Sequence, residues 1–378
     1  MPPVRIGLRH TANLSCKMMD YCAIHAYYMG GQGQGRRCAA RYSQAERSSM
    51  SLSIGGIPVP HAAILAPMSG VTDWPFRRAV RRSGGGLVVT EMVASAAVLA
   101  NVRSEMRKLR IEALAESPLS IQLAGWEPPV MAEAARICAG LGATFIDINM
   151  GCPARKVTGK LSGSALMRDP HLAAAIMAAV VGAVSVPVTL KMRLGWDDNM
   201  RNAPDLAKVA ADIGIKMIAV HGRTRCQMYN GDADWHQVGA VVDAVDVPVV
   251  VNGDINSLDA VSAAIEASHA AGVMIGRGAQ GRPWLLGQAG DLLAGRTPKP
   301  APDIPMRHQL MRLHLDDMLT HYGSAAMRLA RKHIAWYAHG LPGAADLRDI
   351  ANNSTDATAV FAAVDRFFKT MDPALVAA

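Results

Sequence analysis

Eight short β-rich runs recur along the chain, and the segments between most of them are rich in alanine at helical spacing. The runs are 63–69, 87–92, 119–125, 145–153, 187–193, 217–223, 247–255 and 272–279. Strands that alternate with helices pair in parallel, because each helix carries the chain back to begin the next strand. Eight such units over roughly 220 residues are typical of an α/β fold of the (β/α)8 TIM-barrel type. A doubly wound open sheet is the alternative. We favour the barrel because polar or glycine-containing sequence follows each run, where barrels build active sites.

A second domain is expected after the barrel. The stretch 296–305 is rich in proline and reads as a linker, which bounds a barrel domain of residues 50–295. Residues 306–378 then show helical spacing in "RHQLMRLHLDDMLTHYG", "AAMRLARKHIAWYAHGL" and "DATAVFAAVDRFFKTM". The sequence therefore predicts a small C-terminal all-helical domain.

Residues 1–49 differ from the rest of the chain. They show no sustained period and hold seven Lys or Arg against two Asp or Glu, whereas Met50 opens a stretch that reads like a natural protein start. We expect either a disordered leader or an over-extended start, and a chain that begins at Met50 should be as active as the whole.

Composition narrows the class of protein. Half of the 378 residues are hydrophobic and 19% are charged, which supports a large folded core. No apolar run is long enough to cross a bilayer, so no membrane partner is expected. The six cysteines form no CxxC pair and no zinc-ligand spacing, so neither a metal site nor a disulfide framework is indicated, and a reducing, cytoplasmic setting is expected. We also expect a monomer. The net charge of +8 comes largely from residues 1–49, so charge alone does not indicate a nucleic-acid partner.

Polar residues stand at the carboxyl ends of all eight predicted strands. One such residue is commonplace, but eight in register would crowd one face with buried polar groups if they served packing alone. The set is Pro67, Met68 and Ser69, then Glu91, Gln122, Asn149 with Cys152, Lys191 with Arg193, His221 with Arg223, Asn252, Gly253 and Asp254, and Gly276 with Arg277.

The last two strand ends suggest a phosphate site. The sequences "NGD" and "GRGAQGRP" supply glycines whose backbone can approach a phosphate, and Arg277 adds a positive charge. Residues 276–281 spell G-x-G-x-x-G, but no ribose-binding acid and no further strand follow as a dinucleotide-binding fold requires. A phosphate here, with Lys191 near the middle and Gln122 opposite, suits flavin mononucleotide (FMN), because a lysine can stabilise the negative edge of a reduced flavin.

Cys152 stands in "IDINMGCPARKV", on the loop after the fourth strand. An ordinary buried thiol in a turn is one interpretation. A thiol with its usual pKa near 8.5 is protonated at neutral pH and can act as a general acid. The cations of Arg155 and Lys156 would favour a thiolate, which suits a nucleophile, and they would also suit a polyanionic substrate. The sequence leaves these alternatives open.

The combination of motifs resembles the tRNA-dihydrouridine synthase family over about residues 60–350. The resemblance rests on "LAPMSGVTDWPFR", "EMV", "IQLAG", "DINMGCPARKV", "GSALM", "LKMRLGWDD", "AVHGRTR", "VVVNGDI" and "GRGAQGRPW", and "RKHIAWYAHGLPGA" is similar to the family's C-terminal RNA-binding domain. Members bind FMN in a barrel, reduce it with NADPH, and reduce the C5–C6 double bond of selected uridines in tRNA. The leader before Met50 is a departure from the family pattern.

The resemblance implies a role for each matching residue. Hydride would pass from the flavin to C6 of the uracil, and Cys152 would protonate C5. The cofactor residues would be Pro67, Met68, Ser69, Gln122, Lys191, His221, Asn252, Gly253, Asp254, Gly276 and Arg277. Asn149 and Arg223 would face the target base, and Arg155 and Lys156 would meet the RNA. No metal is implied.

A cationic strip in the tail is a second candidate RNA contact. Arg328, Arg331 and Lys332 recur at helical spacing beside Trp336 and Tyr337. An ordinary solvated helix face over buried aromatic residues is the alternative.

Two other functions remain open from the sequence. A small-molecule flavin oxidoreductase of the dihydroorotate dehydrogenase type would not need the helical tail, so loss of the tail should spare its activity. A flavin-free RNA-binding protein that keeps the barrel would give a colourless preparation.

Overall fold

The computed structural model describes residues 50–109, 117–159 and 161–371, except for the side chain of Lys156. Its strands are β1 (Leu52–Ile54), β2 (Ile57–Val59), β3 (Ala63–Leu65), β4 (Val88–Val89), β5 (Val93–Ala94), β6 (Leu119–Ala124), β7 (Phe145–Met150), β8 (Val188–Arg193), β9 (Ile218–His221), β10 (Val249–Asn252) and β11 (Gly272–Ile275). The expectation for residues 1–49 lies outside the described residues.

Eight parallel strands close into a barrel, which confirms the predicted TIM-barrel fold. The order is β4-β3-β11-β10-β9-β8-β7-β6-β5, and β4 also pairs with β6, so that β4 and β5 are two halves of the second strand. Both faces of β6, β7 and β8 are buried. Burial on both faces explains why these strands read as nearly continuous apolar runs.

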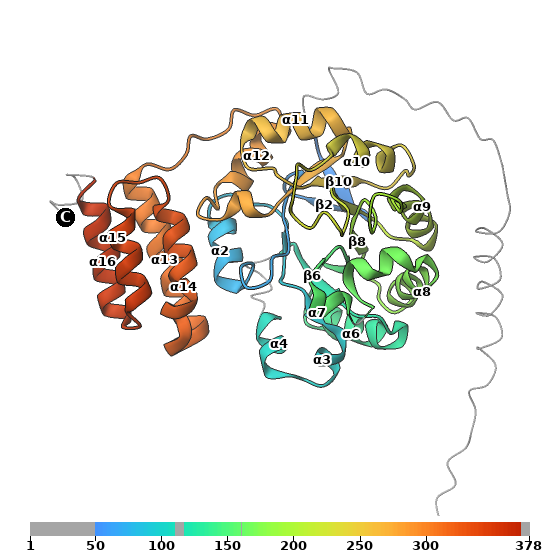
Figure 1. Cartoon of the computed structure of the whole chain (residues 1–378), viewed down its shortest axis with the longest axis horizontal. Helices are drawn as coiled ribbons and strands as arrows, with labels where there is room; N and C mark the ends of the chain where they lie inside the picture. The colour runs from blue at the N-terminus through green and yellow to red at the C-terminus, as the bar shows by residue number, and fades with distance from the viewer. Residues whose placement is uncertain (1–49, 110–116, 160, 372–378) are drawn as a thin grey trace, which may run out of the picture. The chain divides into compact units, whose positions relative to one another are not determined.

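Helices follow the strands and surround the barrel (Figure 1). They are α2 (Trp74–Arg82), α3 (Ser95–Leu99), α4 (Arg103–Lys108), α6 (Pro128–Gly140), α7 (Arg155–Thr158), α8 (Pro170–Val181), α9 (Ala203–Ile213), α10 (Trp235–Val242), α11 (Leu258–Ser268) and α12 (Leu285–Leu293), with 3-10 turns η2 (Gly163–Arg168) and η3 (Arg277–Ala279). Alanines on α6, α8 and α9 are buried. Small side chains on these faces let the helix backbones pack close to the sheet.

A four-helix bundle forms the C-terminal part of the described chain. Its helices α13 (Ile304–Tyr322), α14 (Ala326–Ala338), α15 (Ala344–Asn353) and α16 (Ala357–Lys369), with η4 (Gly323–Ala325), lie side by side in Figure 1. They enclose an apolar core that includes Met311, Leu315, Ile334 and Phe368. Helix α13 begins inside the predicted linker, because the Asp303 carboxylate accepts a hydrogen bond from the Met306 amide (2.9 Å) and caps the helix.

Two features of the fold were not predicted. Strands β1 and β2 form an antiparallel hairpin before the barrel, and Gly55 and Gly56 make its two-residue turn at positive φ. The second predicted strand is interrupted at residues 90–92. In the described part of the chain, no helix is both long and apolar enough to cross a membrane.

Candidate active site

A cavity of about 840 Å³ opens at the carboxyl ends of the barrel strands. Pockets of roughly 300–1,000 Å³ are typical for cofactors and small ligands. The predicted residues that line it are Pro67, Met68, Ser69, Gln122, Asn149, Cys152, Lys191, His221, Asn252, Gly253, Asp254, Gly276 and Arg277. Side chains that are far apart in sequence are therefore brought together at one mouth.

The Cys152 thiol and the Lys191 amine face this same cavity. Lys191 lies within β8, and its neighbour in the register of β7 is Asn149. The Asn149 side-chain oxygen accepts hydrogen bonds from the backbone amides of Gly151 (3.2 Å) and Cys152 (3.0 Å). These bonds fix the loop that carries the half-buried cysteine, so the thiol is presented from a rigid backbone.

The side-chain amine of Lys191 is buried, and its pKa is lower than that of an ordinary lysine. Its Nζ donates to the side-chain oxygen of Asn252 (2.9 Å). Burial and the charge of Arg193 together lower the pKa of Lys191 to about 8, while the charges of Asp147 and Cys152 act in the opposite direction. A perturbed amine in a cavity is characteristic of functional sites.

A buried polar network surrounds Gln122 behind the cavity wall. The Gln122 side-chain nitrogen donates to Asp147 (2.6 Å), and its oxygen accepts from the Asn149 amide (2.7 Å). The Thr189 hydroxyl donates to the other oxygen of Asp147 (2.6 Å), and burial raises the pKa of this carboxyl. Both ends of the Gln122 amide are thus engaged, which fixes its orientation at the cavity.

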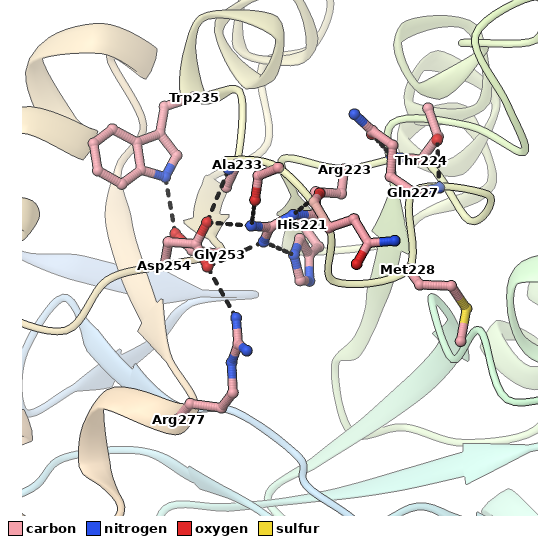
Figure 2. Close-up of polar contacts among 12 residues, drawn as sticks. His221, Arg223, Thr224, Gln227, Met228, Ala233, Trp235, Gly253, Asp254 and Arg277 are labelled. Carbon is pink, nitrogen blue, oxygen red and sulfur yellow. Dashed lines mark hydrogen bonds and ion pairs between the residues drawn. The ribbon is translucent and has the colours of Figure 1, made fainter.

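Asp254 joins two arginines at the last strand ends (Figure 2). One carboxylate oxygen accepts from Arg223 (2.5 Å) and from the Ala233 amide (2.9 Å), and the other accepts from Arg277 (3.0 Å). Burial alone would raise the pKa of Asp254, but these hydrogen bonds and the charges of both arginines lower it. The carboxylate is therefore ionised and holds Arg277 at the cavity rim.

Gly253 lets the backbone approach its neighbours beside this carboxylate. Its φ is +116°, and a Cβ there would lie 2.7 Å from the Cβ of Ala233. The Asn252 amide next to it donates to the carbonyl of Met274 (2.7 Å) and ties β10 to β11. The "NGD" sequence thus forms a tight loop at the cavity, and its contact with a phosphate stays a prediction.

Arg223 and His221 occupy different positions relative to the cavity. His221 lines it, and burial together with the charges of Arg193 and Lys191 lowers its pKa well below the usual value. Arg223 is only 2% exposed and is not among the lining residues. Its guanidinium contacts Asp254, His221 Nε2 (3.3 Å) and the Asn230 carbonyl (3.2 Å). In this geometry Arg223 supports the site from behind, and its predicted contact with the base stays a prediction.

The predicted RNA contacts whose side chains the structure describes do not line the cavity. Arg155 is exposed on α7, next to the loop of Cys152, and the side chain of Lys156 is outside the described part. Arg328, Arg331 and Lys332 lie on α14 of the bundle. Of these three, Arg328 is exposed, whereas the Lys332 ammonium donates to the backbone carbonyl of Gly70.

Arg193 and Tyr229 are two of the lining residues that the sequence assignment missed. Arg193 is buried and donates to the carbonyls of Gly151 (2.8 Å), Thr224 (2.8 Å) and Met228 (2.9 Å), so it joins the Cys152 loop to the loop after β9. Tyr229 is 53% exposed at the rim. The centroid of its ring lies 5.6 Å from the guanidinium carbon of Arg193 and 5.3 Å from that of Arg277. Arg193 stood among the strand-end residues but received no role, and a lone aromatic in the polar loop "TRCQMYNGD" was the available signal for Tyr229.

Comparison with known proteins gives relatives along most of the chain. Three of them are "Probable tRNA-dihydrouridine synthase" of Rickettsia conorii (48% identical over 85% of this chain and 97% of the relative), the protein of the same name of Rhodobacter capsulatus (48%, over 86% and 100%) and tRNA-dihydrouridine synthase B of Pseudomonas aeruginosa (46%, over 83% and 95%).

Solved structures share the fold at low sequence identity. A 2-naphthoyl-CoA reductase in complex with 2-naphthoyl-CoA gives a TM-score of 0.51 at 12% identity, over 66% of this chain and 52% of that chain. The 6-hydroxypseudooxynicotine amine oxidase of Pseudomonas geniculata gives 0.52 at 12% identity, over 71% and 52%. At this identity the similarity concerns the barrel architecture.

The family comparison covers both the barrel and the bundle. Residues 64–372 match the family described as "Dihydrouridine synthase (Dus)". This range contains every motif on which the resemblance was based, and each barrel motif except "GSALM" contributes at least one residue to the lining of the cavity. The chain therefore belongs to the dihydrouridine synthase family, as its sequence motifs predicted.

Proposed function

We propose that this protein reduces the C5–C6 double bond of specific uridines in tRNA, with FMN held in the barrel cavity and NADPH as the reductant. The observation that carries the proposal is the convergence of the Cys152 thiol and the Lys191 amine on one cavity at the barrel mouth. The names of the relatives, which are tRNA-dihydrouridine synthases, agree with it.

The residues present fit a flavin mononucleotide. The cavity is large enough for a ring system, and one end of it has the glycine-containing loops at Gly253 and Gly276 with Arg277 beside them, which suit a phosphate. Lys191 would bond the pyrimidine edge of the ring, where its positive charge stabilises negative charge. Gln122 would bond the same ring from the opposite wall, and residues 67–69 would line one of its faces.

When bound and reduced, FMN supplies the hydride that reaches C6 of the uracil. Cys152 then completes the reaction by giving its proton to C5 of the uracil, so that the double bond gains one hydride and one proton. The hydrogen bonds from Gly151 and Cys152 to Asn149 keep the thiol loop at the mouth, where a base that has left the RNA stack can reach it.

The substrate is a polyanion, and the positive groups around the mouth suit it. Arg155 is exposed beside the thiol loop, and Arg328 is exposed on the bundle. Phosphate contacts from such residues would orient the tRNA, while the cavity would accept the extruded uracil. We propose that the protein works in the cytoplasm as a monomer, with a barrel domain and a helical tRNA-binding domain.

The test is mass spectrometry of nucleosides from an unmodified tRNA after incubation with the full chain, FMN and NADPH. We expect a uridine that has gained two hydrogens. Reduction of a small pyrimidine with no change in tRNA would instead support a small-molecule flavin oxidoreductase. A preparation that binds no flavin and leaves tRNA unchanged would contradict the proposal.

A further inference from the structure

The loop between β3 and α2 connects the cavity to the helical bundle. Pro67, Met68, Ser69 and Val71 of this loop line the cavity. The Met68 carbonyl accepts the amides of Val71 (2.9 Å) and Thr72 (3.0 Å), so the loop is a tight turn of its own. Its position against a bound ligand therefore depends on what holds the outer side of the turn.

Two charged side chains hold that outer side at Gly70. The Gly70 amide donates to the Glu91 carboxylate (2.5 Å), which comes from the interruption between β4 and β5. The Gly70 carbonyl accepts from the ammonium of Lys332, which comes from α14 of the bundle. Gly70 has a φ of +75°, so the turn uses a conformation that favours glycine. The peptide groups on either side of Gly70 are thus held from two different parts of the fold.

A third contact joins the end of the same loop to the bundle. The Tyr322 hydroxyl, at the end of α13, donates to one oxygen of the Asp73 carboxylate (2.8 Å). The other oxygen of Asp73 accepts the Phe76 amide (3.0 Å) and caps α2. Burial raises the pKa of Asp73 to about 6, and the hydrogen bond from Tyr322 opposes this shift.

The packing of the bundle on α2 fixes where Lys332 can reach. The ring of Phe76 lies 5.7 Å from the rings of both His314 and His333, and Asp317 of α13 pairs with Arg78 (3.0 Å) and with Arg82. These contacts come from several turns of α2, α13 and α14. They leave little freedom for α14 to slide along α2. The Lys332 ammonium is therefore held at a fixed position beside Gly70.

We propose that Lys332 is a positioning residue for the cofactor, and that the docked bundle completes the flavin site by holding Gly70 opposite Glu91. The inference rests on the proposed binding of FMN in the cavity. It assigns Lys332 a task other than the phosphate contact predicted from its place in the cationic strip. The bundle then orders residues 67–69 against the ring even when no RNA is bound.

The test compares FMN binding by the full chain in the absence of RNA. Lys332→Met removes the ammonium and keeps the length of the side chain, and Lys369→Met is the matched control on an exposed lysine of the same bundle. We expect Lys332→Met to bind FMN about tenfold more weakly, the size expected for one lost charged hydrogen bond, with an altered visible circular dichroism of the flavin. Lys332→Arg should restore much of both signals, and Lys369→Met should match the wild type.

A second variant guards against a loss of folding in the first. Tyr322→Phe removes the other bundle contact to this loop and should change the circular dichroism of the bound flavin in the same direction. Folded variants that both bind FMN with wild-type affinity and spectrum would overturn the proposal. A raised KM for tRNA with unchanged FMN binding in Lys332→Met would do so too and would make Lys332 an RNA contact. A wild-type protein that binds no FMN would instead refute the proposed function itself.

Discussion

At the residue scale, the site depends on polar groups whose charges are set by burial. Lys191 and Asp147 both lie inside the barrel, where burial disfavours their charged forms and moves their pKa values toward each other. Hydrogen bonds compensate both groups, from Gln122 and Thr189 to Asp147 and from Lys191 to Asn252. The amine is therefore held in place while remaining able to lose its proton near neutral pH.

Replacement of the thiol tests its proposed role directly. We expect Cys152→Ala to bind FMN and tRNA as the wild type does and to lose most of its turnover, because the proton donor is gone while the loop bonds to Asn149 remain. Proton transfer by a positioned group contributes roughly a hundredfold or more to a rate. Single-turnover assays of uridine reduction measure the loss.

The exposed Cys226 provides the control for this experiment. It lies on the loop after β9 and does not line the cavity, so Cys226→Ala should leave turnover unchanged. Full activity in Cys152→Ala would remove the thiol from the mechanism.

The pH dependence of FMN binding tests the state of Lys191. Its pKa of about 8 means that the ammonium dominates below that pH and the neutral amine above it. Binding of an anionic cofactor should therefore weaken, by about tenfold at full deprotonation, as the pH rises through this value. Fluorescence titration of FMN at a series of pH values measures it.

Two variants show whether Lys191 is the group that titrates in this pH experiment. Lys191→Met should bind weakly at every pH and lose the dependence, whereas Lys208→Met, on the outer face of α9, should retain it. A dependence that persists in Lys191→Met would assign the titration to another group.

At the scale of elements, the loops after β9, β10 and β11 act together. Arg223, Asp254 and Arg277 stand on these three loops, and the Asp254 carboxylate links the other two. Arg223 is almost completely buried. Removal of the negative charge of Asp254 would therefore leave the buried guanidinium of Arg223 without its ionic partner. Such losses cost several kcal/mol in closed sites and less where the pair is partly open to water.

Asp254→Asn tests the link. We expect a loss of stability of about 2 kcal/mol, because Asp254 is itself 26% exposed, and weaker FMN binding at the phosphate end. Asp365→Asn is the matched control in the bundle, since its arginine partner Arg312 is 39% exposed and should contribute less than about 1 kcal/mol. Denaturant melts measure both. Equal effects of the two variants would contradict the special role of the buried Arg223.

The sequence predicted helices and strands well where a continuous or periodic apolar pattern marks them. It predicted them poorly where contacts with residues distant in the sequence determine the local structure. Every barrel strand except β5 lies within a predicted run, because parallel strands buried on both faces leave a continuous apolar signal, whereas β5 begins just after the predicted run 87–92. The interruption between β4 and β5 carries no such signal, since Thr90 and Glu91 stop the ladder through side-chain hydrogen bonds to distant residues. For the same reason, strand-end position identified Gln122 as a site residue but could not reveal its partners.

At the scale of the whole chain, the bundle packs on the barrel through α2 with an interface that contains two buried histidines. The rings of His314 and His333 lie 4.7 Å apart, and within the described residues their nitrogens have no hydrogen-bond partner. Burial and the charges of Arg82 and Lys332 lower the pKa of His314 to about 3, and burial, His314 and the charge of Lys332 lower that of His333 well below its usual value. Both rings are therefore neutral in the folded protein.

This burial predicts a loss of stability in acid. In the unfolded chain both histidines take up a proton below about pH 6.5, whereas the folded protein binds none until far lower. Stability should therefore fall as the pH drops below that value, by roughly 1 kcal/mol per pH unit for each histidine. Thermal melts between neutral and acidic pH measure the slope.

His333→Leu should reduce the slope, and His339→Leu, at the exposed end of α14, is its control. An unchanged slope in His333→Leu would show that acid acts elsewhere. The tail pattern "RKHIAWYAHGL" predicted a helix but gave His333 no role, because its burial follows from packing against Phe76, which is more than 250 residues away.

The comparisons with known proteins test some of the predictions made from the sequence motifs. The family and the oxidoreductase class expected from the sequence are confirmed, and the names of the relatives agree with the tRNA-dihydrouridine synthase function that we propose. The roles of individual residues, the domain boundaries and NADPH as reductant remain predictions that the experiments above address.

Because the second strand is split, the number of paired residues between neighbouring strands varies around the barrel. Only Leu65 and Val88 pair between β3 and β4, whereas β7 and β8 pair along five positions. At the break, the amide of Gln122 is held by the hydroxyl of Thr90 in place of a backbone carbonyl (3.1 Å). Thermal fluctuations should separate the sheet there first, so amide hydrogens near the split should exchange with deuterium sooner than those of β7 and β8.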